Sequence, residues 1–147
     1  MSSGYRTLHL DDIPTVRFDE ETSIPAWKPV RRELGISAFG TNAYVAEAAG
    51  EIVIEPHDEL PSSNEAGPGH QEIYLVLDGS ARFTVDGDDF DVARGGIVFL
   101  EDPALQRQAV ALEAGTVVFA VGAPAGEVFV PSDWEDDFLR RGTRDAG

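Results

Sequence analysis

The 147-residue sequence predicts an all-β domain, a sandwich or barrel of short strands, with an arm before it and one short helix after it. Two observations predict the strands. From residue 37 onward, runs rich in valine, isoleucine and aromatic residues recur at short spacing, and glycine, proline and aspartate separate these runs. The helix is predicted by a third observation, the run SDWEDDFLRR near the C-terminus, in which acidic residues precede arginines.

The N-terminal part of the chain, residues 1–36, contains three prolines and little periodicity. It is expected to form an arm that packs on the barrel, with one short strand near residues 15–18. Residues 37–130 are expected to form the barrel itself. Its strands are predicted within the runs SAFGTNAYVAEA, EIVIEP, IYLVLDGSARFTVDGDDFDV, GGIVFLEDP and QRQAVALEAGTVVFAVG.

Turns are expected where glycine follows a small or acidic residue, at Asp78-Gly79 and at Asp86-Gly87. The last segment, residues 131–147, is expected to hold the C-terminal helix and a tail. Ser132 or Asp133 can cap that helix, because both side chains accept hydrogen bonds from free backbone N–H groups.

The composition excludes several classes of protein. The net charge is −16, with 27 acidic residues against 11 basic ones, so nucleic acid is not an expected partner. No apolar run is long enough to span a membrane, and the start MSSGYRTLHLDD lacks the apolar segment of a secretory signal. Cysteine is absent, which suits a reducing compartment, and we expect a cytoplasmic location.

Two of the three histidines lie two residues before a glutamate, His57 before Glu59 and His70 before Glu72. Residues at this spacing point to the same side of a strand. If both segments are extended, each histidine therefore shares a face with its glutamate. Imidazole and carboxylate groups together are typical metal ligands, so this repeated pattern is a candidate metal site.

The second pattern begins a strand that is expected to be central. One face would carry His70, Glu72, Tyr74 and Val76, and the other Ile73, Leu75 and Leu77. Beyond its first residues this strand is apolar on both faces, which predicts that both faces are buried. A buried carboxylate such as Glu72 costs several kcal/mol unless a cation or hydrogen-bond donor pairs with it. A metal ion or a histidine is the natural partner.

At these residues the chain resembles the cupins. Glu72, followed by IYLVLD and Gly79, matches the E-x6-G that closes the first cupin motif. Upstream, Gly50 precedes EIVIEP and His57, one residue longer than the motif requires. The run GGIVFLEDPALQRQ, residues 95–108, resembles the second motif. The resemblance covers about residues 38–122 and implies a double-stranded β-helix, the jelly-roll barrel of cupins.

Two alignments of the first motif remain open. Without a gap, the two motif histidines fall on Ala66 and Pro68, and the usual metal site is lost. With the loop LPSSNEAGPG treated as an insertion, they fall on His57 and Glu59. We prefer the second alignment, because it keeps the strand EIVIEP in place and puts the loop where a turn belongs. In the second motif the histidine position falls on Gln106.

The resemblance implies a divalent metal, with Fe, Mn, Ni or Zn as candidates, and no organic cofactor. Two imidazoles and one carboxylate would form a facial triad with open positions for a ligand. The candidate metal ligands are His57, Glu59, His70, Glu72 and Gln106, and the candidate catalytic residues are Glu72 and Tyr74.

Two functions follow from these residues. The first is a metal-dependent dioxygenase, isomerase or lyase that acts on a small polar molecule in the barrel. The alternative is a metal-free cupin that binds a small ligand, or an auxiliary protein without catalysis, in which Glu72 hydrogen-bonds Tyr74 or Gln106. The missing histidine of the second motif favours the alternative, whereas His57 and Glu72 favour the metal.

The expected assembly is a homodimer, as is common among cupins. The outer face of the strand over residues 70–77 needs apolar cover. The arm offers the apolar side chains Val16, Phe18 and Trp27. These side chains are expected to cover that face, either within one chain or across a two-fold axis.

Overall fold

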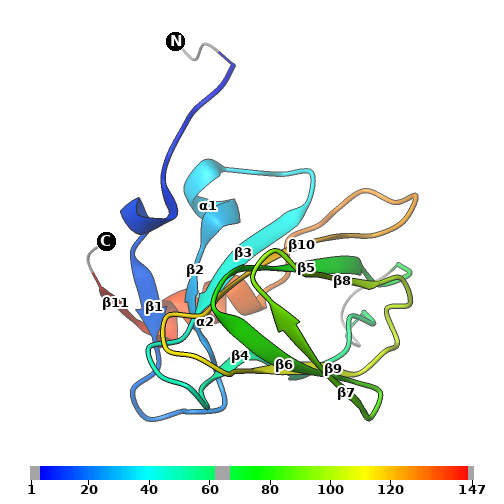
Figure 1. Cartoon of the computed structure of the whole chain (residues 1–147). Helices are drawn as coiled ribbons and strands as arrows, with labels where there is room; N and C mark the ends of the chain where they lie inside the picture. Colours follow the sequence, from blue (N-terminus) through cyan, green and yellow to red (C-terminus); the bar gives the residue numbers. More distant parts are fainter. Residues whose placement is uncertain (1–3, 62–66, 146–147) are drawn as a thin grey trace.

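The computed structural model describes residues 4–61 and 67–145, which fold as a double-stranded β-helix with a short C-terminal helix (Figure 1). Two antiparallel sheets of seven and four strands face each other. In spatial order the larger sheet contains β11 (Thr143–Asp145), β1 (Thr15–Arg17), β2 (Ala26–Lys28), β3 (Gly40–Val45), β10 (Val117–Ala123), β5 (Gln71–Asp78) and β8 (Ile97–Leu100). The smaller contains β4 (Ile52–His57), β9 (Arg107–Ala111), β6 (Ser80–Val85) and β7 (Asp88–Ala93).

The predicted turns are confirmed. Gly79, between β5 and β6, has φ of 69°, and a Cβ atom there would collide with Thr116. Asp86 and Gly87, between β6 and β7, both have positive φ, which a two-residue hairpin with the twist of its strands requires. Glycine and aspartate therefore set where these strands end.

The main core lies between the two sheets. It follows the alternation of the strands, because every second residue of β5 and β10 points inward. Its buried members are Ala46, Val53, Ile54, Tyr74, Val76, Ala81, Phe83, Val98, Leu100, Ala109, Ala111, Val118 and Ala120. Several inward positions carry small side chains, which leaves room for a cavity at one end of the barrel.

The N-terminal arm joins the larger sheet as strands, and its helical turns cover only part of the outer face of that sheet. β1 and β2 extend this sheet beyond β3, and Val16 and Trp27 are fully buried. A second small core of Ile13, Val30 and Ala43 lies on the outer side of β3, under α1 (Val30–Leu34) and a 3-10 turn over Leu10–Asp12. None of the described members of this core belongs to β5, so the arm does not cover that strand within one chain, and cover across a two-fold axis stays a prediction.

The C-terminal helix α2 (Trp134–Arg141) forms as predicted, with three acids in its first turn and two arginines in its last. Asp133 occupies the cap position, but its side chain makes no capping hydrogen bond. Packing helps to hold the helix, since the rings of Trp134 and Trp27 lie 5.0 Å apart. No helix in the described part of the chain is both long and apolar enough to cross a membrane.

The outer face of the β5–β8 edge remains apolar and exposed. On β8, Ile97 is 62% exposed and Phe99 is 57% exposed. They lie directly opposite Leu75 and Ile73 of β5, which are only half-buried. Contiguous exposed apolar side chains of this kind are typical of protein–protein interfaces.

We propose that this face forms the two-fold interface of a homodimer. Phe99→Asp should convert the dimer to a monomer, because it would place a charge in the apolar interface. Light scattering coupled to size-exclusion chromatography would measure the mass. Leu112→Asp, at a partly exposed apolar site that follows β9 in the other sheet, is the matched control and should stay dimeric. A wild-type protein that is monomeric at tens of micromolar would contradict the proposal.

Candidate metal centre and cavity

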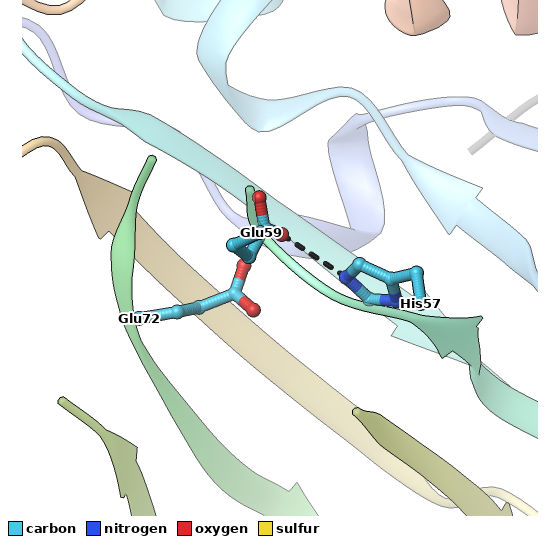
Figure 2. Close-up of side chains that lie close together, drawn as sticks. All are labelled: His57, Glu59 and Glu72. Atoms are coloured by element: carbon cyan, nitrogen blue, oxygen red, sulfur yellow. Dashed lines mark hydrogen bonds and ion pairs between the residues drawn. The ribbon is translucent and has the colours of Figure 1, made fainter. Parts of the chain in front are cut away.

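Three candidate metal ligands converge at one end of the barrel. His57 is the last residue of β4, Glu59 lies two residues further on, and Glu72 is the second residue of β5. One ligand atom from each of the three lies within 4.8 Å of the others. Figure 2 shows the two carboxylates and the imidazole turned toward a common point. This is the arrangement that the alignment with a loop insertion predicts, and Ala66 of the other alignment lies outside the described residues.

Two contacts fix the His57 ring. Its Nδ1 lies 2.7 Å from the carbonyl oxygen of Glu55, and its Nε2 lies 3.0 Å from a carboxylate oxygen of Glu59. Because a carbonyl oxygen only accepts, Nδ1 carries a proton and donates it there. Nε2 then faces a carboxylate and needs a positive species between the two atoms, either a second proton or a metal ion.

The pKa of His57 agrees with this requirement. Burial disfavours the charged imidazolium, but the hydrogen bond and negative charge of Glu59, together with the Glu55 carbonyl, outweigh it and raise the pKa of His57 to about 9. In the absence of metal, His57 is therefore the cation that balances Glu59 at neutral pH.

Glu72 has a different counter-ion, Arg107. The guanidinium Nη1 donates to Glu72 Oε1 at 3.1 Å, and the Arg107 side chain is fully buried. Arg107 also donates to the backbone carbonyl of Leu105 at 3.0 Å. Burial and the nearby Glu59 charge raise the pKa of Glu72 to about 7, although His57 and Arg107 act in the opposite direction.

The structure corrects the expected position of Gln106. Its side chain is exposed and donates to Asp58 at 3.2 Å, outside the barrel interior. Arg107 points inward instead and lies opposite His57 in the β4–β9 pair. Sequence reasoning missed this arginine by one residue, and a one-residue shift along a strand exchanges its two faces.

His70 and Tyr74 lie near the three converging residues. His70 Nδ1 is 3.9 Å from a carboxylate oxygen of Glu59, and the His70 ring lies 5.5 Å from that of Phe129. His70 is thus a neighbour of the centre that could complete its ligand set. Tyr74 is buried, and burial and the charge of Glu72 raise the pKa of its hydroxyl well above the usual value. Tyr74 therefore keeps its proton over the whole physiological range.

A cavity of about 440 Å³ adjoins this centre, a volume suited to a small molecule. Both sheets and α2 contribute to its wall. The lining residues include the polar and charged side chains of Thr41, Asn42, Glu55, His57, Asp58, Glu59, His70, Glu72, Asp133 and Glu135, and the aromatic side chains of Trp27, Tyr44, Tyr74, Phe129, Trp134 and Phe138. Gly40, Ala120 and Gly122 supply small inward-facing positions on β3 and β10.

A second buried ion pair attaches α2 to this cavity. Arg31 of α1 donates to both carboxylate oxygens of Glu135, at 2.9 to 3.2 Å. Both side chains are almost completely buried. Sequence reasoning also missed Trp27, Asn42 and Glu135 as cavity residues, because tertiary packing brings these distant segments together and no local motif marks them.

Comparison with known proteins shows the fold. No protein-family model matches this chain, and no curated protein matches it. Among solved structures, the chain is similar to a cupin protein from Bacteroides fragilis, with 16% identity, 90% of this chain and 93% of that chain covered, and a TM-score of 0.60. A protein with a double-stranded β-helix domain from Klebsiella pneumoniae gives 17% identity, coverage of 86% and 99%, and a TM-score of 0.59.

A third similar structure is a sugar phosphate isomerase from a cupin superfamily of Silicibacter pomeroyi. It is 14% identical to this chain, covers 83% of both chains and gives a TM-score of 0.59. At identities this low, the three similarities establish the architecture and leave the chemistry to the residues of the site.

The first prediction from this site concerns Arg107. Arg107→Met should lower the free energy of unfolding by about 3 kcal/mol at about pH 8, because it leaves the ionised Glu72 buried without its cation. Urea unfolding would measure the loss. Arg82→Met is the matched control, since Arg82 forms an exposed pair with Asp91 and its loss should change stability much less. Equal losses in both variants would contradict a special role for the buried pair.

The second prediction concerns pH. The folded-state pKa of Glu72, about 7, lies above its ordinary value of 4.5. Between these values the folded protein holds a proton that the unfolded chain has lost, so the contribution of Glu72 to stability is fully present at acidic pH and falls as the pH rises through 7. The stability of wild type relative to Glu72→Gln should therefore fall by roughly 2 kcal/mol between about pH 5 and pH 8. Urea unfolding in EDTA would measure it, and a rise over this range would contradict the pKa.

Proposed function

We propose that this chain, which has the fold of the cupin superfamily, binds a divalent metal ion through His57, Glu59 and Glu72 and a small polar molecule in the adjoining cavity. The observation that carries the proposal is the convergence of three ligand atoms within 4.8 Å. The hydrogen bond from Nδ1 of His57 to a backbone carbonyl supports it, because this contact is typical of metal-binding histidines and leaves Nε2 for the metal.

The donor set suits a hard or borderline divalent ion. Two carboxylates and one imidazole favour Fe, Mn, Ni or Zn, and His70 lies close enough to Glu59 to join them. A metal held there would act as a Lewis acid on an oxygen atom of the bound molecule. Tyr74, buried and protonated, would donate a hydrogen bond inside the cavity. These roles suit isomerase, lyase or dioxygenase chemistry on a small oxygen-rich compound.

A second candidate function has an observation of its own. Arg107 already supplies a positive charge to Glu72, at 3.1 Å. With that charge in place, the cavity can bind a polar molecule without metal. Glu72, with a pKa of about 7, is then suited to accept or release a proton at neutral pH. The metal-binding experiment separates the two functions.

Metal titration is the test of the proposal. Isothermal titration calorimetry with Mn²⁺, Ni²⁺ and Zn²⁺ on EDTA-treated, untagged protein should show one site per chain. His57→Ala and Glu59→Gln should each weaken binding at least about tenfold, or about 1.4 kcal/mol, and His70→Ala should do less.

The control is His9→Ala, because His9 is the remaining histidine and lies in the exposed arm. This variant should bind metal like wild type. Equal metal binding by wild type, His57→Ala and Glu59→Gln would contradict the metal centre and support the metal-free pocket.

A further inference from the structure

Part of the negative charge of the cavity wall is balanced from within the protein. Three of the six carboxylates that line the cavity each contact a cation of the same chain. The pairs are Glu59 with His57, Glu72 with Arg107, and Glu135 with Arg31. Within the described residues no lysine or arginine lines the cavity, so an anionic ligand would meet carboxylates and no unpaired cation. A cationic ligand would meet three carboxylates whose charge is already compensated, beside Glu55, Asp58 and Asp133.

Three buried polar atoms of the cavity residues have no hydrogen-bond partner among the residues that the structure describes: the hydroxyl of Tyr74, Nε1 of Trp27 and Oδ1 of Asn42. Nε1 of Trp27 can only donate, and Oδ1 of Asn42 can only accept. Trp27 is 0% exposed and Asn42 is 4% exposed. The Asn42 amide orientation is set by Nδ2, which donates to Glu135 at 3.4 Å. Buried polar atoms of this kind are costly unless something satisfies them.

Strand register places the two residues in one corner of the cavity. Trp27 lies directly opposite Tyr44 in the β2–β3 pair. Asn42 precedes Tyr44 by two residues and points to the same face, so Trp27 and Asn42 are diagonal neighbours. A single hydroxyl group could accept a hydrogen bond from the indole N–H and donate one to the amide oxygen. A phosphate dianion offers only acceptors, and an ammonium group offers only donors, so neither fills both roles in this way.

We propose that the cavity binds a neutral polyhydroxy molecule, such as a free pentose, hexose or alditol, with one hydroxyl between Trp27 and Asn42. The inference rests on the proposed function, since it names the class of small polar molecule. From Asn42 the inward row continues through Ala120 of β10 to Tyr74 of β5. Two strand spacings, about 10 Å, separate the ends of this row, which suits a chain of about five or six carbons.

The other groups of the wall fit the same class of ligand. The carboxylate oxygens of Glu59 and Glu72 can accept hydrogen bonds from hydroxyl groups while they keep their own cations. The aromatic rings along the wall offer apolar surface to the C–H groups of a sugar or alditol. A neutral polyhydroxy compound therefore matches both the unpartnered polar atoms and the three paired carboxylates.

The test compares matched probes on the full chain. Saturation-transfer NMR titrations should use glucose and xylitol as neutral probes, glucose 6-phosphate as the anion and glucosamine as the cation, each with Zn²⁺ and again with EDTA. Either with Zn²⁺ or with EDTA, glucose or xylitol should have a dissociation constant at least about tenfold lower than that of each charged probe. Tighter binding of glucose 6-phosphate or glucosamine, or no binding of either neutral probe at millimolar concentration, would overturn the proposal.

Two variants locate the hydroxyl position. Trp27→Phe removes the indole N–H and should weaken the neutral probe about tenfold. Trp134→Phe is the matched control, because Trp134 also lines the cavity and packs on Trp27, but its indole N–H is not among the three unpartnered atoms. Asn42→Ala should weaken binding as Trp27→Phe does, and it keeps the test valid if Trp27→Phe fails to fold. Equal losses in Trp27→Phe, Asn42→Ala and Trp134→Phe would show a packing effect and overturn the assignment.

Failure of this inference is distinct from failure of the proposed metal centre. Calorimetry with metal alone reports on His57, Glu59 and Glu72, whereas the sugar titrations report on Trp27 and Asn42. Metal binding without binding of any neutral probe overturns only the ligand class. Binding of a neutral probe in EDTA, with no metal binding, overturns only the metal centre.

Discussion

The ion pair between Arg107 and Glu72 joins the two sheets inside the barrel, and the chemistry of the cavity depends on it. Arg107 belongs to β9 in the smaller sheet and Glu72 to β5 in the larger one. A buried pair of this kind adds little net stability compared with apolar packing, but the loss of either partner leaves an uncompensated charge. The arginine is also bound to the Leu105 carbonyl, so its position is fixed. Glu72 is thereby held at the cavity wall beside Glu59, where like charge and burial raise its pKa.

The second buried pair, Arg31 with Glu135, also joins a carboxylate of the cavity wall to a buried arginine. Arg31 contacts the carboxylate bidentately, and this geometry is stronger and more specific than a single ammonium contact. It links α1 of the arm to α2 at the end of the chain. The smaller sheet has only four strands, so it cannot cover the inner face of the seven-stranded sheet completely. The C-terminal helix covers part of the remainder, and Trp134 packs on Trp27 there.

Local signals made the strands and turns predictable. Gly79 is required by its backbone conformation and by the lack of space beside Thr116, so the spacing from Glu72 to Gly79 marks a real turn. His57, Glu59 and Glu72 could be found because residues two apart on an extended segment share a face. The Gln106 prediction failed because it followed the histidine position of the second motif, which falls one residue before the inward-facing Arg107. The apolar pattern of β9 could not correct it, because the strand buries alanines and leaves Val110 half-exposed. The partners of Glu72 and Glu135 could not be predicted, because they are set by tertiary packing.

The fixed ring of His57 connects the metal question with the charge of the cavity. Because Nδ1 is committed to a carbonyl, the contact between Nε2 and Glu59 needs either a proton or a metal ion. With the proton, and with both carboxylates ionised, the charges of His57 and Arg107 balance those of Glu59 and Glu72. A divalent ion that replaces the proton adds one positive charge to this group. Neither Trp27 nor Asn42 titrates, so the hydrogen bonds that these two side chains offer to a hydroxyl are the same in both states.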